Sequence, residues 1–215
     1  MYKFKEYTDE EFFGCKLRGV NNVVNAVIGG ATDEGGHYAN IPPSILENAA
    51  RRGKAVHEAI EKFLKSGMDE PLQTDLEFDI YACMFEKWLN ERTEIQEIIG
   101  VETKIISEEL ACKGVIDCIA KFRNKDEDEP FYALVDWKTS SNLDEFRTQC
   151  QLTLYYMLLR EQYPDVADKI EQLRCLQITK YNYRWYRYPI DTKLGSSILY
   201  LYKNYLREQA EKREK

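Results

Sequence analysis

The sequence lacks several features that would assign it to a broad class of protein. No stretch approaches the roughly 18 consecutive apolar residues of a membrane-spanning helix, which predicts no membrane association. Residues 1–6 carry charges where a signal peptide has its apolar core, so we expect a cytoplasmic location rather than secretion. The six cysteines form no CxxC pair, which argues for reduced thiols and against a zinc or disulfide framework.

Neither a nucleotide-binding motif nor an excess of basic residues is present. The glycine-rich run at residues 29–36 indicates a loop, but it lacks the GKS/T ending of a P-loop, so we assign no nucleotide site and no ATPase motor. The net charge is -7, whereas nucleic-acid-binding proteins usually have a basic surface. The acidic balance does not exclude such binding, because a bound metal supplies positive charge and a basic channel can coexist with an acidic exterior.

The length of 215 residues suits one domain with one well-buried core. Hydrophobic residues make up 44% and charged residues 31%, as in ordinary soluble globular proteins. Within this single domain we expect an N-terminal extension over residues 1–41, a core over 42–190, and a C-terminal helix and tail over 191–215.

Hydrophobic periodicity predicts alternating helices and strands. A capping-box pattern, Ser44 to Glu47, predicts the start of the first helix. The predicted helices span residues 44–65, 74–91, 143–162 and 192–208. The predicted strands span 98–106, 110–122, 131–137, 173–180 and 183–188, with a polar, acidic turn at 123–130 and a hairpin formed by the last two. This order indicates an α/β sandwich in which helices pack on a mixed central sheet.

The apolar run at residues 131–138 ends with two charged side chains, Asp136 and Lys138, separated by one residue. Side chains alternate across a strand, so both project from one face, where charge is costly unless it is used. Asp117 follows Gly114 near the expected end of the preceding strand, and that glycine would allow close approach of a backbone or ligand. Neighbouring strands lie about 4.8 Å apart, so the two aspartates could share a cation. Two carboxylates and a lysine are what metal-assisted phosphodiester hydrolysis requires, although an aspartate near a strand end is more often a turn or cap residue.

Gln151 and Tyr155 lie four positions apart in the predicted third helix. They therefore project from one face and could reach the same phosphate or the same lysine. Either residue alone would be unremarkable, as a surface glutamine or a core tyrosine. Together with the strand residues they strengthen the prediction of a site.

These motifs resemble the RecB-like branch of the PD-(D/E)XK nucleases, which includes lambda-type exonucleases and stand-alone phage and mitochondrial relatives. The matching segments, in family order, are residues 52–57, Glu102, 114–117, 135–140 and 151–155. The resemblance implies a single nuclease domain with the PD-(D/E)XK restriction-endonuclease-like fold, a mixed central β-sheet flanked by α-helices.

The resemblance also implies roles at a Mg²⁺ or Mn²⁺ site. His57, Asp117, Asp136 and the Trp137 carbonyl would bind the metal, with a helix-surface or core histidine as the alternative for His57. Lys138 would orient or deprotonate the attacking water. An ammonium beside two carboxylates favours its charged form, so orientation and electrostatic stabilisation are the roles we expect for it.

Other residues receive roles from the same resemblance. Gln151 and Tyr155 would contact the phosphate backbone or hold the lysine, as catalytic or substrate-binding residues. Glu102 matches a possible additional acid, with an exposed strand glutamate as an equal alternative. The family's iron–sulfur subgroup needs three cysteines after this helix, and only Cys175 follows it, so we expect no iron–sulfur cluster.

Two groups of basic residues are candidates for substrate contacts. Arg51, Arg52 and Lys54 lie within about two helical turns of His57 and would bind phosphate. Residues 180–188 interleave cations with aromatic side chains, a composition that single-stranded nucleic acid favours. The alternative, an aromatic hairpin packed on the last helix, is the one we favour, since aromatic residues are enriched in strands.

The sequence thus predicts a divalent-metal-dependent deoxyribonuclease that hydrolyses DNA phosphodiester bonds by metal-activated water. The resemblance implies an exonuclease of DNA recombination, repair or phage DNA processing that takes single-stranded DNA or duplex ends, alone or with a recombination or single-strand-binding partner. One alternative is a non-catalytic nucleic-acid- or protein-binding module, which the intact set of Asp117, Asp136 and Lys138 disfavours. Another is a restriction-type endonuclease, which would not predict His57 or the Gln151 and Tyr155 helix.

Overall fold

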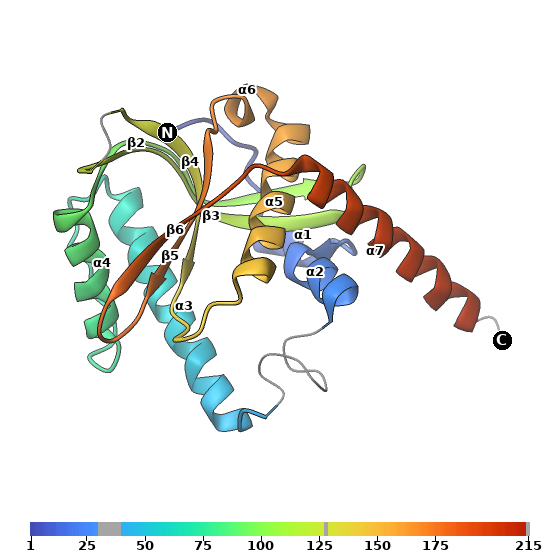
Figure 1. Cartoon of the computed structure of the whole chain (residues 1–215), viewed down its shortest axis with the longest axis horizontal. Helices are drawn as coiled ribbons and strands as arrows, with labels where there is room; N and C mark the ends of the chain where they lie inside the picture. The colour runs from blue at the N-terminus through green and yellow to red at the C-terminus, as the bar shows by residue number, and fades with distance from the viewer. Residues whose placement is uncertain (30–39, 127–128, 214–215) are drawn as a thin grey trace.

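A mixed β-sheet with helices on both faces forms the body of the protein in the computed structural model (Figure 1). The structure describes residues 1–29, 40–126 and 129–213. From residue 30 onward the expected glycine-rich loop lies outside these residues, as do positions 127–128 of the acidic turn. Among the described residues, no helix combines the length and apolar character needed to cross a bilayer.

The elements follow the predicted order with three helices and one strand added. The helices are α1 (Asp9–Gly14), α2 (Val20–Ile28), α3 (Pro43–Lys65), α4 (Asp79–Glu91), α5 (Glu145–Gln162), α6 (Pro164–Ala167) and α7 (Thr192–Arg213). The strands are β1 (Arg18–Gly19), β2 (Thr93–Ser107), β3 (Cys112–Asn124), β4 (Phe131–Lys138), β5 (Gln172–Ile178) and β6 (Tyr183–Tyr188). The predicted mixed sheet flanked by helices is therefore confirmed.

The sheet divides where β3 and β4 part. β3 pairs antiparallel with both β2 and β4, and the last β3–β4 pair is Cys118 with Val135. Beyond that pair, β4 continues beside β5 in parallel, whereas β3 continues beside β2 and the short β1. The next residues along the two strands at this fork are Asp117 and Asp136. The parallel β4–β5 pair requires a crossover, which α5 and α6 provide.

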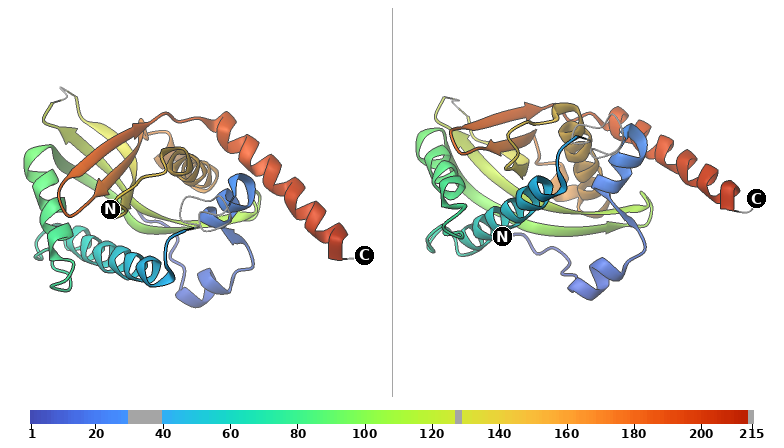
Figure 2. Two further views of the ribbon diagram at one scale, coloured as in Figure 1. Left: turned by 60° about the horizontal axis from the view of Figure 1, so that its bottom comes forward. Right: turned by 90° about the horizontal axis from the view of Figure 1, so that it is seen from below.

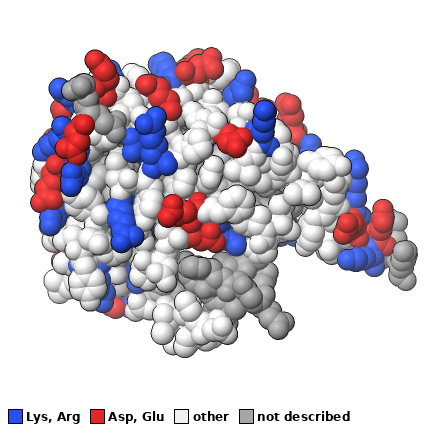
Figure 3. All heavy atoms as spheres, in the orientation of Figure 1, with Lys and Arg blue, Asp and Glu red and all other residues white. Residues whose placement is uncertain are grey.

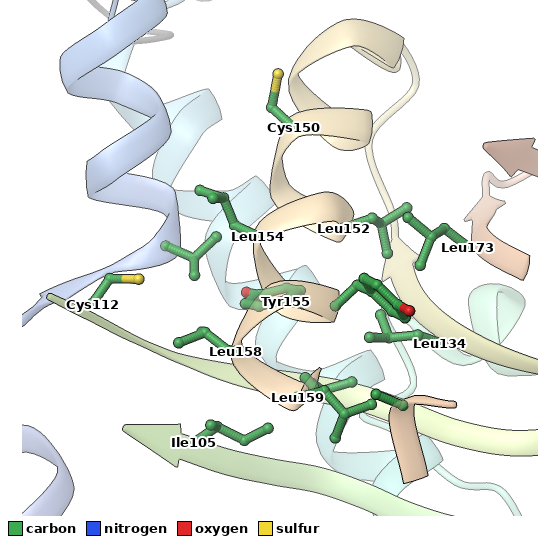
Figure 4. Packing of buried hydrophobic residues seen from close by; sticks show 14 of the residues in the cluster. Ile105, Cys112, Leu134, Cys150, Leu152, Leu154, Tyr155, Leu158, Leu159 and Leu173 are labelled. Carbon is green, nitrogen blue, oxygen red and sulfur yellow. The ribbon is translucent and has the colours of Figure 1, made fainter. Parts of the chain in front are cut away.

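Two apolar clusters fill the two faces of the sheet. One lies under α3 and α4, and the other surrounds α5 together with α2, α6 and α7. The left-hand view of Figure 2 shows α5 end-on within the curve of the sheet. Buried leucines leave α5 on different sides, among them Leu152, Leu154 and Leu158 (Figure 4). Ten residues of α5, polar as well as apolar, are buried between Thr148 and Leu159, so the helix is enclosed on most sides and held against the fork.

Several of the expected boundaries are wrong. The strand expected at 98–106 already begins at Thr93, because its ladder with β3 extends to Asn124. The expected helix at 74–91 begins only at Asp79, because Thr74 uses its backbone N–H and its hydroxyl to bind the Asp79 carboxylate in a turn. The expected capping box is not formed: the helix begins at Pro43, whose fixed φ suits a first helical position, so Ser44 lies inside the first turn. Asp117 lies in the middle of a 13-residue strand rather than near its end, because the β2–β3 ladder runs past it on both sides.

The N-terminal segment contains two helices that periodicity did not predict. Thr8 and Glu11 form a complete capping box that starts α1. α2 is rich in valine, which has only modest helix propensity, but its residues Val20, Val23 and Val24 are buried against α5 and α7. Tertiary packing therefore decides the conformation of α2. The last helix also continues past the expected residue 208, to Arg213.

Candidate metal centre

The fork in the sheet brings together the charged residues at the end of β4. The Lys138 ammonium lies 2.9 Å from Asp136 Oδ1 and 2.7 Å from Oδ2, so the two side chains share one face as expected. Burial alone would lower the pKa of Lys138, but Asp136 and Asp117 outweigh it and hold that pKa above its ordinary value. Without a bound metal the lysine is therefore a positioned cation at neutral pH.

Helix α5 supplies two residues, Gln151 and Tyr155, that form a hydrogen-bonded chain to Asp136. The Gln151 side-chain amide donates to Asp136 Oδ1 at 3.0 Å and to the Tyr155 hydroxyl at 3.1 Å. Burial, followed by the charges of the two aspartates, raises the pKa of Tyr155, so the phenol keeps its proton. Gln151 and Tyr155 share a face as expected, and they act on the carboxylate that also binds Lys138.

Gly114 on β3 makes room for Tyr155. A Cβ at this position would lie 2.5 Å from Cε1 of the tyrosine ring. The close approach that the glycine was expected to allow is therefore made by a side chain of α5. Any larger residue at position 114 would displace the ring that contacts Gln151.

His57 reaches the fork from α3. Its Nδ1 lies 3.6 Å from Asp117 Oδ2 and 3.8 Å from Glu102 Oε1, and its Nε2 lies 2.9 Å from the Trp137 carbonyl oxygen. Among the described residues, His57, Glu102 and Asp117 form the one group of three whose potential ligand atoms all lie within 4.8 Å of one another. Asp117 Oδ2 also accepts the Trp137 N–H at 2.7 Å, so the strand that carries Asp136 is tied to the cluster.

The protonation of this cluster reflects crowded negative charge. Burial raises the pKa of Asp117, His57 opposes the rise and the neighbours Asp136 and Glu102 add to it, so that the pKa lies at about 7. For His57 burial would lower the pKa, but the surrounding carboxylates, Asp117 foremost, raise it to about 9. Without a cation the cluster therefore retains protons that an ordinary aspartate and histidine would lose.

Glu102 has an unusual backbone as well as a functional position. Its φ is +49°, in the left-handed region, although it lies within the long strand β2. That conformation costs a non-glycine residue roughly 1–2 kcal/mol and tends to persist where the surrounding structure requires it. The side chain is 25% exposed and faces His57, so it is not an exposed strand glutamate. The geometry thus separates the two alternatives that the sequence left equal.

The donor set fits a hard divalent cation. Carboxylate oxygens suit Mg²⁺ and Mn²⁺, and an imidazole nitrogen is compatible with Mn²⁺. Asp136 Oδ2 is buried and lies 2.7 Å from the Lys138 ammonium, with no other partner among the described residues. A cation would share this oxygen with the lysine if Asp136 joined the cluster as a further ligand.

Two hollows meet at the cluster. The smaller, of about 430 Å³, is lined by the fork residues and by Phe12, Phe13, Asn21 and Asn22. The larger, of about 1200 Å³, runs along residues 1–7 of the chain. No periodic pattern predicts that these N-terminal residues lie beside the fork, because they arrive there through tertiary packing alone.

The expected phosphate-binding residues on α3 divide into two groups. Lys54 lines the larger hollow together with His57. Arg51 instead binds Glu77 at 2.8 Å, and Arg52 lies over the Tyr81 ring of α4. Only Lys54 of the three therefore lines a hollow that reaches the cluster.

The aromatic hairpin packs mainly into the protein. Trp185 lies 4.9 Å, between ring centroids, from Trp88 of α4, and Tyr188 is buried in the cluster that contains α7. The prediction that the hairpin packs into the protein is therefore confirmed, but its main neighbour is α4 and not the last helix. Lys180, Arg184 and Arg187 remain exposed. Figure 3 shows basic and acidic side chains interspersed on the face it presents, with no continuous basic surface among the described residues there.

Comparison of the chain with models of known protein families gave a match. The family model of the PD-(D/E)XK nuclease superfamily matches residues 72–182, a span that includes Glu102, Asp117, Asp136, Lys138 and the α5 pair but not His57. No curated protein matches the chain. A solved structure named "Crystal structure of SSO0001" is 18% identical, covers 74% of this chain and 71% of its own, and has a TM-score of 0.33.

Proposed function

The chain belongs to the PD-(D/E)XK nuclease superfamily, and from this premise we propose that it is a divalent-metal-dependent deoxyribonuclease that acts as an exonuclease. The observation that carries the proposal is the grouping of Asp117, Asp136 and Lys138 at the fork, beside His57 and Glu102. Two or more carboxylates with a charged lysine at one end of a pocket suit hydrolysis of a phosphodiester.

We propose that His57, Glu102 and Asp117 hold Mg²⁺ or Mn²⁺, with Asp136 Oδ2 as a further ligand. When bound, the cation supplies Lewis acidity toward the phosphate and lowers the pKa of water at the site. The His57 Nδ1 faces the two carboxylates, while its Nε2 lies beside the Trp137 carbonyl. A ring held through its second nitrogen is the usual arrangement for a histidine ligand. The role of the Trp137 carbonyl as an additional oxygen ligand stays a prediction.

Lys138 is proposed to stabilise negative charge as the attacking oxygen adds to phosphorus. The aspartates hold its ammonium charged, which favours orientation and charge stabilisation over acceptance of a proton from the attacking water. It can donate hydrogen bonds to that water and to a non-bridging phosphate oxygen. Gln151 and Tyr155 are proposed to fix the Asp136 carboxylate, and through it the lysine, and they remain candidates for contacts with the phosphate backbone.

Lys54 is proposed to bind a substrate phosphate in the larger hollow. For Arg51 and Arg52 the same role requires that they leave Glu77 and Tyr81, so we assign it to Lys54 first. An exonuclease of the RecB-like branch, acting in recombination, repair or phage DNA processing, is supported by the order of motifs from His57 to Tyr155. A recombination or single-strand-binding protein as a partner is part of the same proposal.

Digestion assays test the proposal. Linear and circular DNA, single- and double-stranded, would be incubated with the chain and Mg²⁺, Mn²⁺ or a chelator. We expect metal-dependent cleavage of linear DNA, lost in Asp117→Ala and Lys138→Ala and kept in Lys87→Ala, an exposed lysine on α4. Cleavage by both site variants would refute the residue assignment, and cleavage of circles would refute the exonuclease. No cleavage under any condition would favour a binding module.

A further inference from the structure

The short helix α1 is fixed beside the metal centre by several independent contacts. Its capping box joins Thr8 and Glu11 in both directions, at 3.2 and 2.8 Å. The Lys104 ammonium of β2 binds Asp9 at 2.6 Å, and the Lys113 ammonium of β3 donates to the carbonyl of Cys15 at 2.9 Å. Two lysines from adjacent strands therefore clamp the two ends of a helix that is too short to be stable alone.

The two phenylalanines of α1 have opposite environments. Phe12 is 4% exposed, and the ammonium groups of Lys104 and Lys113 lie 5.8 and 5.1 Å from its ring. Phe13 is 69% exposed, although its ring lies only 5.4 Å from that of Phe12 and nearly perpendicular to it. A single exposed aromatic side chain is common on protein surfaces. Phe13 differs because the backbone that carries it is fixed.

Phe13 also occupies a particular place. It lines both hollows at the metal centre, and it shares that property with His57 and Val115. The smaller hollow further presents the exposed amides of Asn21 and Asn22. The ring therefore stands where the two hollows meet, and it lines the smaller one together with the fork residues.

A volume of about 430 Å³ is in the range of small-molecule sites, so the smaller hollow has room for a nucleotide. Aromatic rings beside cations bind single-stranded nucleic acid by stacking on bases whose faces are free. In a duplex those faces are covered by neighbouring base pairs. Side-chain amides such as those of Asn21 and Asn22 can donate to and accept from base edges.

We propose that Phe13 stacks on the unpaired base next to the phosphate at the metal centre, so that the enzyme takes single-stranded or frayed DNA. The proposal rests on the nuclease function above and names the form of its substrate. Phe13 is then a residue that determines specificity, and α1 is the element that positions it.

Binding and kinetic measurements on three variants test the proposal. Stacking is worth a factor of roughly 5 to 150 in affinity per base by alanine substitution. We expect Phe13→Ala to bind a fluorescent single-stranded oligothymidine in Ca²⁺ about tenfold or more weakly than the wild type, and Phe13→Trp to restore binding. Tyr200→Ala, which removes an aromatic ring of 66% exposure on α7, is the matched control and should bind normally. In Mg²⁺ or Mn²⁺, Phe13→Ala should raise KM for single strands and change kcat little.

An abasic position identifies the stacked nucleotide. A single-stranded substrate lacking the base next to the cleaved phosphate should bind the wild type and Phe13→Ala equally. Equal binding of an intact single strand by both proteins would overturn the proposal, as would an equal loss in Tyr200→Ala. Binding is measured without cleavage, so these outcomes are separate from failure of the nuclease function, which is an absence of cleavage in every assay.

Discussion

Replacement of Asp117 by asparagine should stabilise the metal-free protein while abolishing its activity. The substitution keeps the shape of the side chain. It also keeps an oxygen that can accept the Trp137 N–H, which in the wild type donates to Asp117 Oδ2 at 2.7 Å. It removes a carboxyl group that is 8% exposed and surrounded by other acids. The stabilisation and the loss of activity thus have one origin, the concentration of negative charge needed to bind a cation.

The magnitude follows from the pKa of Asp117, which rises from an ordinary value of 3.8 to about 7. That difference of about 3.2, at about 1.36 kcal/mol for each tenfold change, is about 4 kcal/mol. Because the folded-state pKa is the higher one, this stability is present below about pH 4 and is lost as the pH rises through 7. The variant also deprives His57 of an ionic partner, so we expect a net gain of about 2–3 kcal/mol at pH 8.

Thermal unfolding in chelator, at pH 5 and pH 8, measures this effect. A gain of 2–3 kcal/mol corresponds to a Tm about 4–12 °C above that of the wild type at pH 8, with a smaller difference at pH 5. Asp126→Asn, at a carboxylate whose side chain is 72% exposed, is the control and should change the Tm little at either pH. Excess Mn²⁺ should raise the Tm of the wild type and not that of Asp117→Asn. A variant that is no more stable than the wild type at pH 8 would refute the reasoning.

Gly114→Ala should lower both stability and activity, because its Cβ would lie 2.5 Å from the Tyr155 ring. We expect chemical denaturation to show a loss of about 1–3 kcal/mol in the free energy of unfolding. The control Gly14→Ala, whose Cβ meets nothing within 4 Å, should show almost no loss. An unchanged cleavage rate in the first variant would show that the position of Tyr155 is unimportant. Lys138→Met should lower kcat by roughly 100- to 1000-fold and leave Mn²⁺ binding measurable by calorimetry, and loss of metal binding instead would contradict an electrostatic role. The apparent affinity for Mn²⁺ should rise at least about tenfold between pH 6 and pH 8, because Asp117 and His57 retain protons up to pKa values of about 7 and about 9. An affinity that does not change with pH would argue against these two residues as ligands.

Much of the central fold could be predicted from residue patterns because the forces involved are local or periodic. The strand over 131–137 and the helix over 143–162 agree with β4 and α5 to within two residues. Side-chain alternation placed Asp136 and Lys138 on one face of their strand, and helical spacing placed Gln151 and Tyr155 on one face of their helix. Local patterns failed where distant residues decide the outcome, as in α2, whose valines are helical because α5 and α7 bury them.

The site shows the same division. Its acids, lysine and glutamine were identifiable from their positions in strands and a helix. The arrangement of these side chains relative to one another could not be predicted, because it depends on where β3 and β4 separate. The left-handed backbone of Glu102 is also set by its surroundings and brings that carboxylate to His57. No local pattern could have distinguished it from an exposed strand glutamate.

By itself the sequence determined which side chains are candidates for the chemistry, since the alternation of strands and the turn of helices fix which neighbours share a face. Only the tertiary structure decided that the fork in the sheet brings Asp117 beside Asp136, and that Glu102 completes the cluster with His57. It alone also placed Phe13 at the hollow that the fork residues line. The physical reason is that these contacts join residues far apart in the chain, and their distances depend on sheet curvature and on the packing of whole elements.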